Sequence, residues 1–342
     1  MFDPSIRTHS DALAVLKRLA LVALKNWRVE PQEIQLIKFR ENAVFKILTR
    51  ETDRYALRIH RGGYHSDNEL RSELQWMTAL QAQGIDVPTI VPLPDHGFFS
   101  SVHVDGLIAP LQVDLFEWID GVQLGTSENG LGNDLDNIEG TYRTVGEIAA
   151  RLHNQATTWK IPEGFSRHAW DMPGLVGEAP FWGRFWEFSG LSHEQRELLL
   201  AAREIVRHEM VDLAEGADLS KHYSLIHADF VPENLFVADG KIRLLDFDDA
   251  GFGWHLFELA TALYFIQEDP NFETAKAALI AGYREYRELP DVMLSRLPVF
   301  MIARGFTYLG WVHTRPESEE GKALAPYLTR LACKLAERFV NE

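Results

Sequence analysis

Cysteine and long apolar runs are both scarce in this chain. Its 342 residues include one cysteine, Cys333, which can form no disulfide within the chain and no zinc cluster of several cysteines. No window of 18 uncharged apolar residues is present, and the first 20 residues lack the basic start and apolar core of a signal peptide. We therefore expect a cytosolic protein, in a reducing compartment, with no membrane partner.

Positive charge is also in short supply. The sequence has 34 lysines and arginines against 50 acidic residues, which gives a formal net charge of −16. Such a chain does not favour general binding to a phosphate backbone, so we expect no nucleic-acid partner. A cationic small molecule would be attracted instead. Nothing in the composition sets an oligomeric state.

Three common active-site motifs are missing. No GxGxxG fingerprint follows a strand pattern, and no GxxxxGK[ST] loop occurs. The segment "HEQRE" at residues 193–197 lacks the second histidine of the zinc-protease motif. These absences exclude the dinucleotide oxidoreductase, P-loop and zinc-protease interpretations.

The patterns that are present predict an α+β fold with two lobes. The length is comfortable for two packed lobes, and the apolar content of 46% is ordinary for a globular protein. The first part reads as a small sheet with helices, and helical patterns dominate the rest except around residues 223–252. We therefore expect a β-rich N-terminal lobe with one inserted helix over residues 1–114, a hinge over 115–121 and a mainly helical C-terminal lobe over 122–342.

Individual elements follow from periodicity and turn residues. An amphipathic helix is predicted over residues 10–27, with Ser10 as its cap, and a second helix over 67–84. Residues 125–137 are expected to form a loop. Strands are predicted in four segments: 34–39, 44–48, 55–60 and within 95–121.

An unusual number of acids lies in the segment "IHADFVPENLFVADGKIRLLDFDD", residues 226–249. Asp229 and Asn234 are five residues apart, and Asp246 follows 17 residues after Asp229. Phosphoryl transfer from ATP needs a carboxylate that orients the incoming hydroxyl and oxygen ligands for magnesium, and this spacing offers both. Two carboxylates about 4 Å apart repel by roughly 4 kcal/mol at an effective dielectric constant of about 20, and a divalent cation relieves that repulsion. Asp248 and Asp249 could tune the metal, face a substrate or cap a turn.

The segments "HADFVPENLF" and "RLLDFDDAGFG" resemble the catalytic loop and metal-binding segment of protein-kinase-like small-molecule phosphotransferases. This family includes aminoglycoside phosphotransferases, choline kinases, homoserine kinases and stress-response kinases. The resemblance implies the two-lobed protein-kinase-like fold, with Asp229 as the catalytic residue and with Asn234 and Asp246 as ligands of Mg²⁺. It further implies that His227 braces the loop and that Glu258 is structural.

The strand "YALRIH" adds support from the first lobe, which the resemblance makes the nucleotide-binding lobe. Alternation along the strand turns Ala56 and Arg58 to one face, where Ala56 can cover an adenine and Arg58 can reach phosphates. The strand is similar to the Val-Ala-Ile-Lys strand of kinases, with Arg58 in place of the lysine. Glu73 on the next helix would pair with Arg58, and Glu69 is the competing assignment. In the alternative interpretation, Arg58 and Glu73 are simply solvated.

Further nucleotide contacts are implied by the same resemblance. The turn "FRENAVF", with Glu41 and Asn42, would cover the phosphates. The adenine of ATP would meet backbone groups of Leu115–Ile119, which include Phe116, Glu117 and Trp118.

Aromatic residues cluster in "APFWGRFWEFSG" and "RGFTYLGWVHTR". They could pack between helices, or they could form a rim that encloses an organic cation. The candidates for such substrate contacts are Trp182, Trp186, Tyr308 and Trp311.

Together these features predict a phosphotransferase that depends on ATP and Mg²⁺. It would move the γ-phosphoryl group to a hydroxyl of a small, amine-bearing metabolite or an aminoglycoside. Two alternatives stay open: a Ser/Thr protein kinase of the stress-response type, and a nucleotide-binding pseudokinase, which the arginine at position 58 allows.

Overall fold

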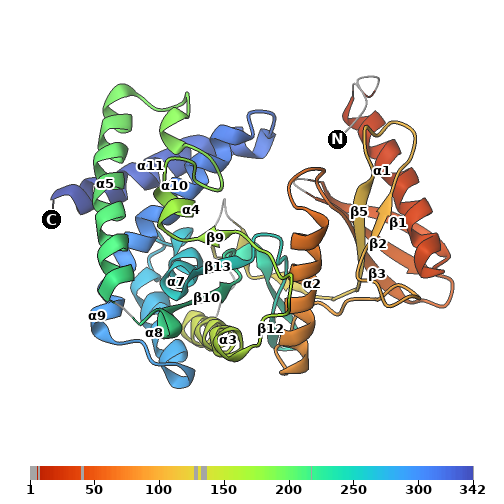
Figure 1. Cartoon of the computed structure of the whole chain (residues 1–342), viewed down its shortest axis with the longest axis horizontal. Coiled ribbons are helices and arrows are strands. Elements are labelled where there is room, and N and C mark those ends of the chain that lie inside the picture. Colours follow the sequence, from red (N-terminus) through yellow and green to blue (C-terminus); the bar gives the residue numbers. More distant parts are fainter. Residues whose placement is uncertain are drawn as a thin grey trace. The chain divides into compact units, whose positions relative to one another are not determined.

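The computed structural model describes Ile6 and residues 8–39, 42–126, 130–131, 137–216 and 218–341 (Figure 1). The chain divides into two compact units. Unit 1 comprises Met1–Asp120 and Ile161–Ser166, and unit 2 comprises Gly121–Lys160 and Arg167–Glu342. Each unit has its own buried apolar residues.

Unit 1 is built on a five-stranded antiparallel sheet in the order β1-β2-β3-β5-β4. The three successive strands and the following helix that the sequence predicts are confirmed. Alternate residues of β2 are buried, which is the pattern of a strand with one face against a core. The strands are β1 (Pro31–Phe39), β2 (Ala43–Thr49), β3 (Arg54–Ile59), β4 (Ser100–Val102) and β5 (Leu111–Glu117).

Helix α1 (His9–Leu24) packs its apolar stripe against one face of this sheet, and the short helix η1 (Lys25–Trp27) follows it. The prediction that Ser10 caps α1 is wrong. Thr8 is the cap, because its hydroxyl accepts the backbone N–H of Asp11 while the Asp11 carboxylate accepts the backbone N–H of Thr8. Ser10 lies inside the first turn.

Helix α2 (Asp67–Ala82) begins with a similar reciprocal cap between Ser66 and Glu69. Its buried residues include the predicted stripe of Leu70, Leu74, Met77 and Leu80. The segment 161–166 joins unit 1 through this helix. The Asn68 side chain donates to the carbonyl of Gly164 at 2.7 Å, and the backbone N–H of Ser166 donates to the Ser72 hydroxyl at 2.9 Å.

Unit 2 is mainly helical. Its long helices are α3 (Ile138–Thr158), α5 (His193–Gly216), α7 (His255–Tyr264), α8 (Phe272–Tyr286), α10 (Leu297–Thr314) and α11 (Glu319–Asn341). Shorter helices are α4 (Met172–Val176), α6 (Leu219–His222), α9 (Asp291–Leu294), η2 (Phe185–Glu187) and η3 (Pro232–Asn234).

Two small sheets lie among these helices, in the strand orders β10-β13-β9 and β12-β11-β6. Their strands are β6 (Val122–Gln123), β9 (Ala169–Trp170), β10 (Tyr223–Ile226), β11 (Leu235–Ala238), β12 (Lys241–Leu244) and β13 (Gly251–Trp254). They confirm the break in helical pattern that the sequence shows around residues 223–252. In the segment predicted as a loop, β7 (Gly125–Thr126) pairs with β8 (Gly130–Leu131), while residues 127–129 and 132–136 lie outside the described part of the chain.

Helix α10 belongs to a long apolar span of the chain. The span Asp291–Thr314 is long and apolar enough to cross a membrane by length and composition, and 72% of the window is buried inside the structure. Helix α10 packs against α7 and α11. Its apolar character is therefore explained by core packing.

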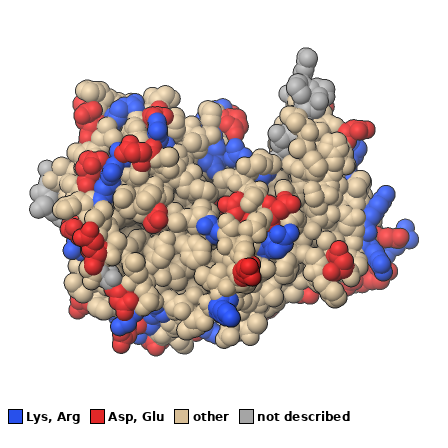
Figure 2. Space-filling model, in the orientation of Figure 1, with Lys and Arg blue, Asp and Glu red and all other residues tan. Residues whose placement is uncertain are grey.

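The surface in Figure 2 shows lysine and arginine side chains scattered among acidic ones rather than gathered into one basic patch. This distribution, on the face shown, agrees with the acidic composition of the chain.

Candidate active site

Asp229 follows strand β10 of unit 2, and both oxygens of its carboxylate accept hydrogen bonds. Nη2 of Arg304 donates to Oδ1 at 2.9 Å, and Nδ2 of Asn234 donates to Oδ2 at 2.7 Å. The Asn234 amide also donates to the Asp229 carbonyl at 3.0 Å. The Asp229 side chain remains 21% exposed, so the carboxylate is held in place while one side of it is open to a reactant.

The backbone before Asp229 is held by a buried carboxylate. Ala228 has a φ of 64°, a left-handed conformation that costs an L-residue roughly 1–2 kcal/mol. Glu258 on α7 opposes this cost, because its two oxygens accept the backbone N–H groups of His227 at 2.8 Å and Ala228 at 2.7 Å. Burial raises the pKa of Glu258 to about 8, although these two donors act in the opposite direction.

His227 links the loop that carries Asp229 to the segment that carries Asp246. The backbone N–H of Asp229 donates to Nδ1 of His227 at 3.1 Å, so Nε2 is the protonated nitrogen and donates to the Leu245 carbonyl at 2.9 Å. Burial lowers the pKa of His227 to about 3, which keeps the ring neutral. A neutral ring with this tautomer braces the loop and does not change its protonation state near neutral pH.

Asn234 and Asp246 are brought together by a hairpin. Strands β11 and β12 pair in the register Leu235↔Leu244, and the N–H of Leu245 donates to the Asn234 carbonyl at 2.8 Å. Asn234 therefore lies opposite Leu245, the residue before Asp246. Asp246 has a φ of 61°, so its backbone is left-handed like that of Ala228. Such strained positions often occur at functional sites.

These side chains fit a magnesium ion that also binds phosphate. The Asn234 amide uses its nitrogen on Asp229, which leaves Oδ1 as the atom that could bind a metal, and Asp246 could supply a carboxylate. Within the described ranges no group of three or more His, Cys, Asp or Glu residues could hold a metal ion. Magnesium does not need such a group, because it is usually held by one or two protein oxygens together with substrate phosphates and water.

The turn after Asp246 is held through its carbonyl groups. The guanidinium of Arg167, 8% exposed, donates to the carbonyls of Ala250 at 2.5 Å and of Asp248. The ring N–H of Trp170 donates to the Asp249 carbonyl at 2.9 Å. The Asp248 side chain is buried and that of Asp249 is half-buried. Sequence analysis did not single out Arg167, because its partners are backbone atoms about 80 residues away.

In unit 1, Arg58 is buried and paired with two carboxylates. Its Nη2 lies 2.8 Å from Oε1 of Glu73, and its Nε and Nη2 donate to the two oxygens of Asp114 at 3.1 and 2.7 Å. The interpretation of Arg58 and Glu73 as solvated residues is therefore wrong. Glu69 is occupied in capping α2, so Glu73 is the partner that the structure selects.

Asp114 was missed by the sequence analysis. It lies on β5 directly opposite Arg58, and Nε2 of His60 is 2.9 Å from its Oδ2. Burial would raise the pKa of Asp114, but Arg58 and His60 together hold it below its usual value. The signal available in the sequence was a lone aspartate in the apolar strand "LQVDLFE".

The other residues predicted to contact the nucleotide lie on β3, on β5 and just after β5. Ala56 pairs with Phe116 across β3 and β5, and the Arg58 guanidinium lies 5.2 Å from the Phe116 ring. The backbone N–H groups of Glu117 and Trp118 already donate to the carbonyls of Thr89 and Arg54 at 2.9 and 3.0 Å. Those two N–H groups are therefore already used and are not available to an adenine.

Of the two residues named for the predicted phosphate-covering turn, Asn42 lies in the described part of the chain. The Asn42 side chain accepts the backbone N–H of Arg61 at 3.0 Å, which ties the turn to the end of β3. Glu41 lies outside the described residues.

The four aromatic candidates each lie against an arginine of this chain. Arg304 lies over the rings of Trp182 and Tyr308 at 5.0 and 4.2 Å. The guanidinium of Arg203 lies 4.1 Å from the centre of the Trp186 ring, and that of Arg315 lies 5.5 Å from the centre of the Trp311 ring. These internal cations favour the packing interpretation over the rim that would enclose a substrate cation.

Arg304 is a further residue of this site whose role the sequence analysis missed. It lies on α10 and is fully buried, yet it reaches Asp229 from 75 residues away. The usable signal was an arginine inside the otherwise apolar run "LPVFMIARGFTYLGWV", since a buried charge requires a partner.

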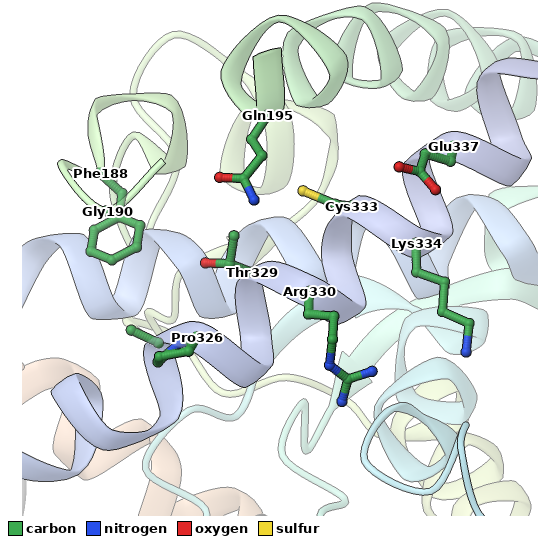
Figure 3. A pocket seen from close by; sticks show the side chains of 10 residues that line it. Phe188, Gly190, Gln195, Pro326, Thr329, Arg330, Cys333, Lys334 and Glu337 are labelled. Carbon is green, nitrogen blue, oxygen red and sulfur yellow. The ribbon is translucent and has the colours of Figure 1, made fainter. Parts of the chain in front are cut away.

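A cavity of about 650 Å³ in unit 2 is lined by residues outside the candidate active site. Figure 3 shows Gln195 of α5 pointing toward α11, where Thr329 and Cys333 are found. Two cations that line it, Arg330 and Lys334, are paired with Glu268. The cavity contains none of the predicted site residues.

Comparison with known proteins identifies the family of this chain. The model of the phosphotransferase enzyme family, APH, matches residues 33–289. A solved structure of a microcompartment-associated aminopropanol kinase is 32% identical, covers 95% of this chain and 98% of that chain, and superposes with a TM-score of 0.81.

Two further relatives are kinases. The amicoumacin kinase of Bacillus subtilis (strain 168) is 23% identical over 292 residues, which is 82% of this chain and 80% of that protein. A homoserine kinase of Chelativorans sp. (strain BNC1) is 29% identical over 212 residues, 58% of this chain and 61% of that protein. Since the family model spans most of the sequence and the aminopropanol kinase aligns over nearly all of it, this chain belongs to the phosphotransferase enzyme family and is a kinase with the protein-kinase-like fold.

Proposed function

We propose that this kinase transfers the γ-phosphoryl group of ATP to the hydroxyl of a small amine-bearing molecule, with an amino alcohol as the first candidate. The observation that carries the proposal is the carboxylate of Asp229, which is held through both oxygens beside Asn234. The likeness to an aminopropanol kinase over 95% of the chain supports an acceptor that combines an amine with a hydroxyl.

Unit 2 supplies the groups for the acceptor side of the reaction. Asp229 would orient the hydroxyl and accept its proton, while Arg304 and Asn234 keep its carboxylate in one orientation. Phosphoryl transfer passes through a loose transition state, so positioning contributes more than the strength of the base. Asn234 and Asp246 would hold magnesium, which neutralises charge on the phosphates when it is bound.

Unit 1 supplies the groups for the nucleotide. Arg58 would bind phosphate oxygens, with Glu73 and Asp114 fixing the plane of its guanidinium. An arginine can perform this role because its nitrogens bind phosphate in pairs, although its fork is larger than an ammonium group. Ala56 and the carbonyls near Glu117 would contact the adenine.

The proposed amine has support from charge. The net charge of −16 attracts cations in general, and Asp248 and Asp249 place acids just after Asp246. A positively charged acceptor would therefore be favoured over a neutral one of the same size.

A panel of acceptors tests the proposal. The purified full chain, Mg²⁺ and γ-labelled ATP are combined with 1-amino-2-propanol, ethanolamine, choline, homoserine and an aminoglycoside, and with 2-propanol as the matched alcohol without an amine. We expect an amino alcohol to be phosphorylated, with kcat/KM at least tenfold above that of 2-propanol.

Three results would contradict the proposal in different ways. Equal rates with 2-propanol and the amino alcohols would show that the acceptor does not need an amine. Label on added protein substrates, with no labelled metabolite, would indicate a protein kinase. Tight binding of ATP with no transfer to any acceptor would indicate a pseudokinase.

A further inference from the structure

A buried arginine on α10 holds one oxygen of the proposed catalytic aspartate. Arg304 is fully buried, and its Nη2 lies 2.9 Å from Oδ1 of Asp229 and 2.8 Å from the hydroxyl of Tyr308. All three residues belong to unit 2. Nothing in the sequence near Asp229 supplies this cation, since the contact joins two segments 75 residues apart.

The surroundings of Arg304 are aromatic. Its guanidinium carbon lies 4.2 Å from the ring centre of Tyr308, 5.0 Å from that of Trp182 and 5.4 Å from that of Phe257. The face of such a ring attracts a cation, and the attraction is stronger when the cation is shielded from water. The rings therefore form a site built for a guanidinium, and they fix its position relative to Asp229.

The hydrogen bonds of Arg304 are incomplete. Its Nε and Nη1 are buried and donate to no residue in the described part of the chain. Replacement of a buried ion pair by apolar residues is often neutral or stabilising, so stability alone gives a weak reason for this arginine. Its contact with Asp229 gives a stronger one.

We infer that Arg304 is a positioning residue for Asp229, and this inference rests on the proposed kinase function. Rotation about the Cβ–Cγ bond of an aspartate is ordinarily easy, because that torsion has a broad minimum. Here Arg304 holds Oδ1 and Asn234 holds Oδ2, so two donors from separate elements fix the plane of the carboxylate. The acceptor hydroxyl then meets a carboxylate of fixed orientation.

An arginine suits this position better than a lysine. One Nη2 atom serves both Asp229 and Tyr308, and the flat guanidinium lies over the Tyr308 ring at the same time. An ammonium group could keep the charge but not the planar stacking. The structure therefore predicts a graded loss from arginine to lysine to an uncharged side chain.

The variants Arg304→Met and Arg304→Lys test the inference through steady-state kinetics with the best acceptor. We expect Arg304→Met to lower kcat about 100-fold, the size of effect that a displaced catalytic group produces, with the KM for ATP within threefold of the wild type. Arg304→Lys should lose about tenfold.

The matched control is Arg203→Met. Arg203 is also buried, stacks on Trp186 at 4.1 Å and donates to the carbonyls of Val176 and Gly177, but it has no hydrogen bond to Asp229. We expect its kcat within twofold of the wild type even if its melting temperature falls as much as that of Arg304→Met.

A double-mutant cycle separates positioning from general support of the fold. If Arg304 acts through Asp229, Arg304→Met should change the residual rate of Asp229→Asn by less than threefold, because the carboxylate that it positions is gone. If Arg304→Met does not fold, the same cycle is run with Arg304→Lys.

The outcomes are distinct for the inference and for the proposed function. An active wild type whose Arg304 variants keep full kcat overturns the inference alone. Equal losses from Arg304→Met in both backgrounds also overturn it, since they would indicate a general structural effect. A wild type that transfers phosphate to no acceptor overturns the proposed function and the inference with it.

Discussion

At the scale of single residues, Arg58 shows how an arginine is accommodated where the resembled kinase strand carries a lysine. Its guanidinium spreads over two carboxylates, with Glu73 on one nitrogen and Asp114 on two. The antiparallel register of β3 and β5 sets Arg58 directly opposite Asp114. A planar fork matches a carboxylate with two hydrogen bonds, which a lysine cannot do.

We expect Arg58→Lys to keep ATP binding within about tenfold but to destabilise unit 1 by roughly 3 kcal/mol, because Asp114 loses a paired contact while it stays buried. Calorimetric titration with ATP and urea denaturation measure the two effects. Arg54→Lys on the same strand is the control, since Arg54 is 42% exposed and should tolerate the change. Unchanged stability in Arg58→Lys would show that the two-carboxylate clamp matters little.

Asp246 can be tested against a matched aspartate of the same hairpin. Asp246 and Asp239 both have positive φ, at 61° and 52°, and asparagine tolerates this conformation. We expect Asp246→Asn to weaken magnesium-dependent nucleotide binding at least tenfold, because the metal loses a charged ligand, and Asp239→Asn to leave it unchanged.

The measurement is the affinity for a nonhydrolysable ATP analogue as Mg²⁺ is varied. The same magnesium dependence in Asp246→Asn and in the wild type would remove Asp246 from the proposed metal site.

At the scale of elements, the crossing of α3 and α8 depends on two glycines. A Cβ added at Gly282 of α8 would lie 1.9 Å from the Arg143 carbonyl, and one added at Gly146 of α3 would lie 2.0 Å from the Leu279 carbonyl. The two backbones therefore touch. This crossing places His153 of α3 next to Tyr283 of α8, whose hydroxyl is 2.9 Å from Nδ1 of the histidine.

We expect Gly282→Ala to lower the free energy of unfolding by about 3 kcal/mol or more, because the added methyl group meets backbone that cannot move aside. Gly216→Ala at the end of α5 is the control, since nothing lies within 4 Å of its added Cβ. Denaturant unfolding compares the two variants. Equal stabilities for Gly282→Ala and the wild type would mean that the helices can separate at little cost.

At the scale of the whole molecule, buried titratable groups make stability depend on pH. Burial lowers the pKa of His227 to about 3 and lowers the pKa values of His153 and His255 well below the usual range. Each binds a proton in the unfolded chain below about pH 6.5 that it does not bind when folded. Their contribution is therefore complete above pH 6.5 and is lost as the pH falls. Glu258, with a pKa of about 8, acts in the opposite direction and loses stability as the pH rises from about 4.5 to 8.

Three histidines outweigh one glutamate, so we expect the protein to lose stability on acidification from pH 6.5 to 5. Each histidine adds about 0.7 kcal/mol per pH unit to the slope at pH 6.5, rising to about 1.4 near pH 5 as the unfolded histidine becomes fully protonated. Urea unfolding at several pH values measures the slope, which is proportional to the number of protons that the chain takes up on unfolding. We expect His255→Phe to reduce that number by one at the acidic end of this window. A slope that His255→Phe leaves unchanged would contradict the assignment of His255 as a group buried in its neutral form.

The local part of the site was predictable because short-range rules place it. Asn234 and Asp246 flank a two-strand hairpin that turns at Asp239 and Gly240, so pairing within a dozen residues brings them together. Asp229 lies five residues before Asn234 and joins them through the Asn234 amide. The α+β division into two lobes followed from the period of apolar residues along strands and helices, whereas the protein-kinase-like fold was implied by the resemblance of the motifs.

The tertiary structure alone decided which charges balance that local cluster. Arg304 reaches Asp229 across 75 residues, and Asp114 reaches Arg58 across 56. The tertiary structure also pairs Arg58 with Glu73 and not with Glu69. It places arginines of the same chain over the rings of the aromatic candidates. A sequence shows which charged residues lie in apolar surroundings, but their partners depend on how distant segments pack, because a buried charge is stabilised by whatever group the fold brings within a few ångströms.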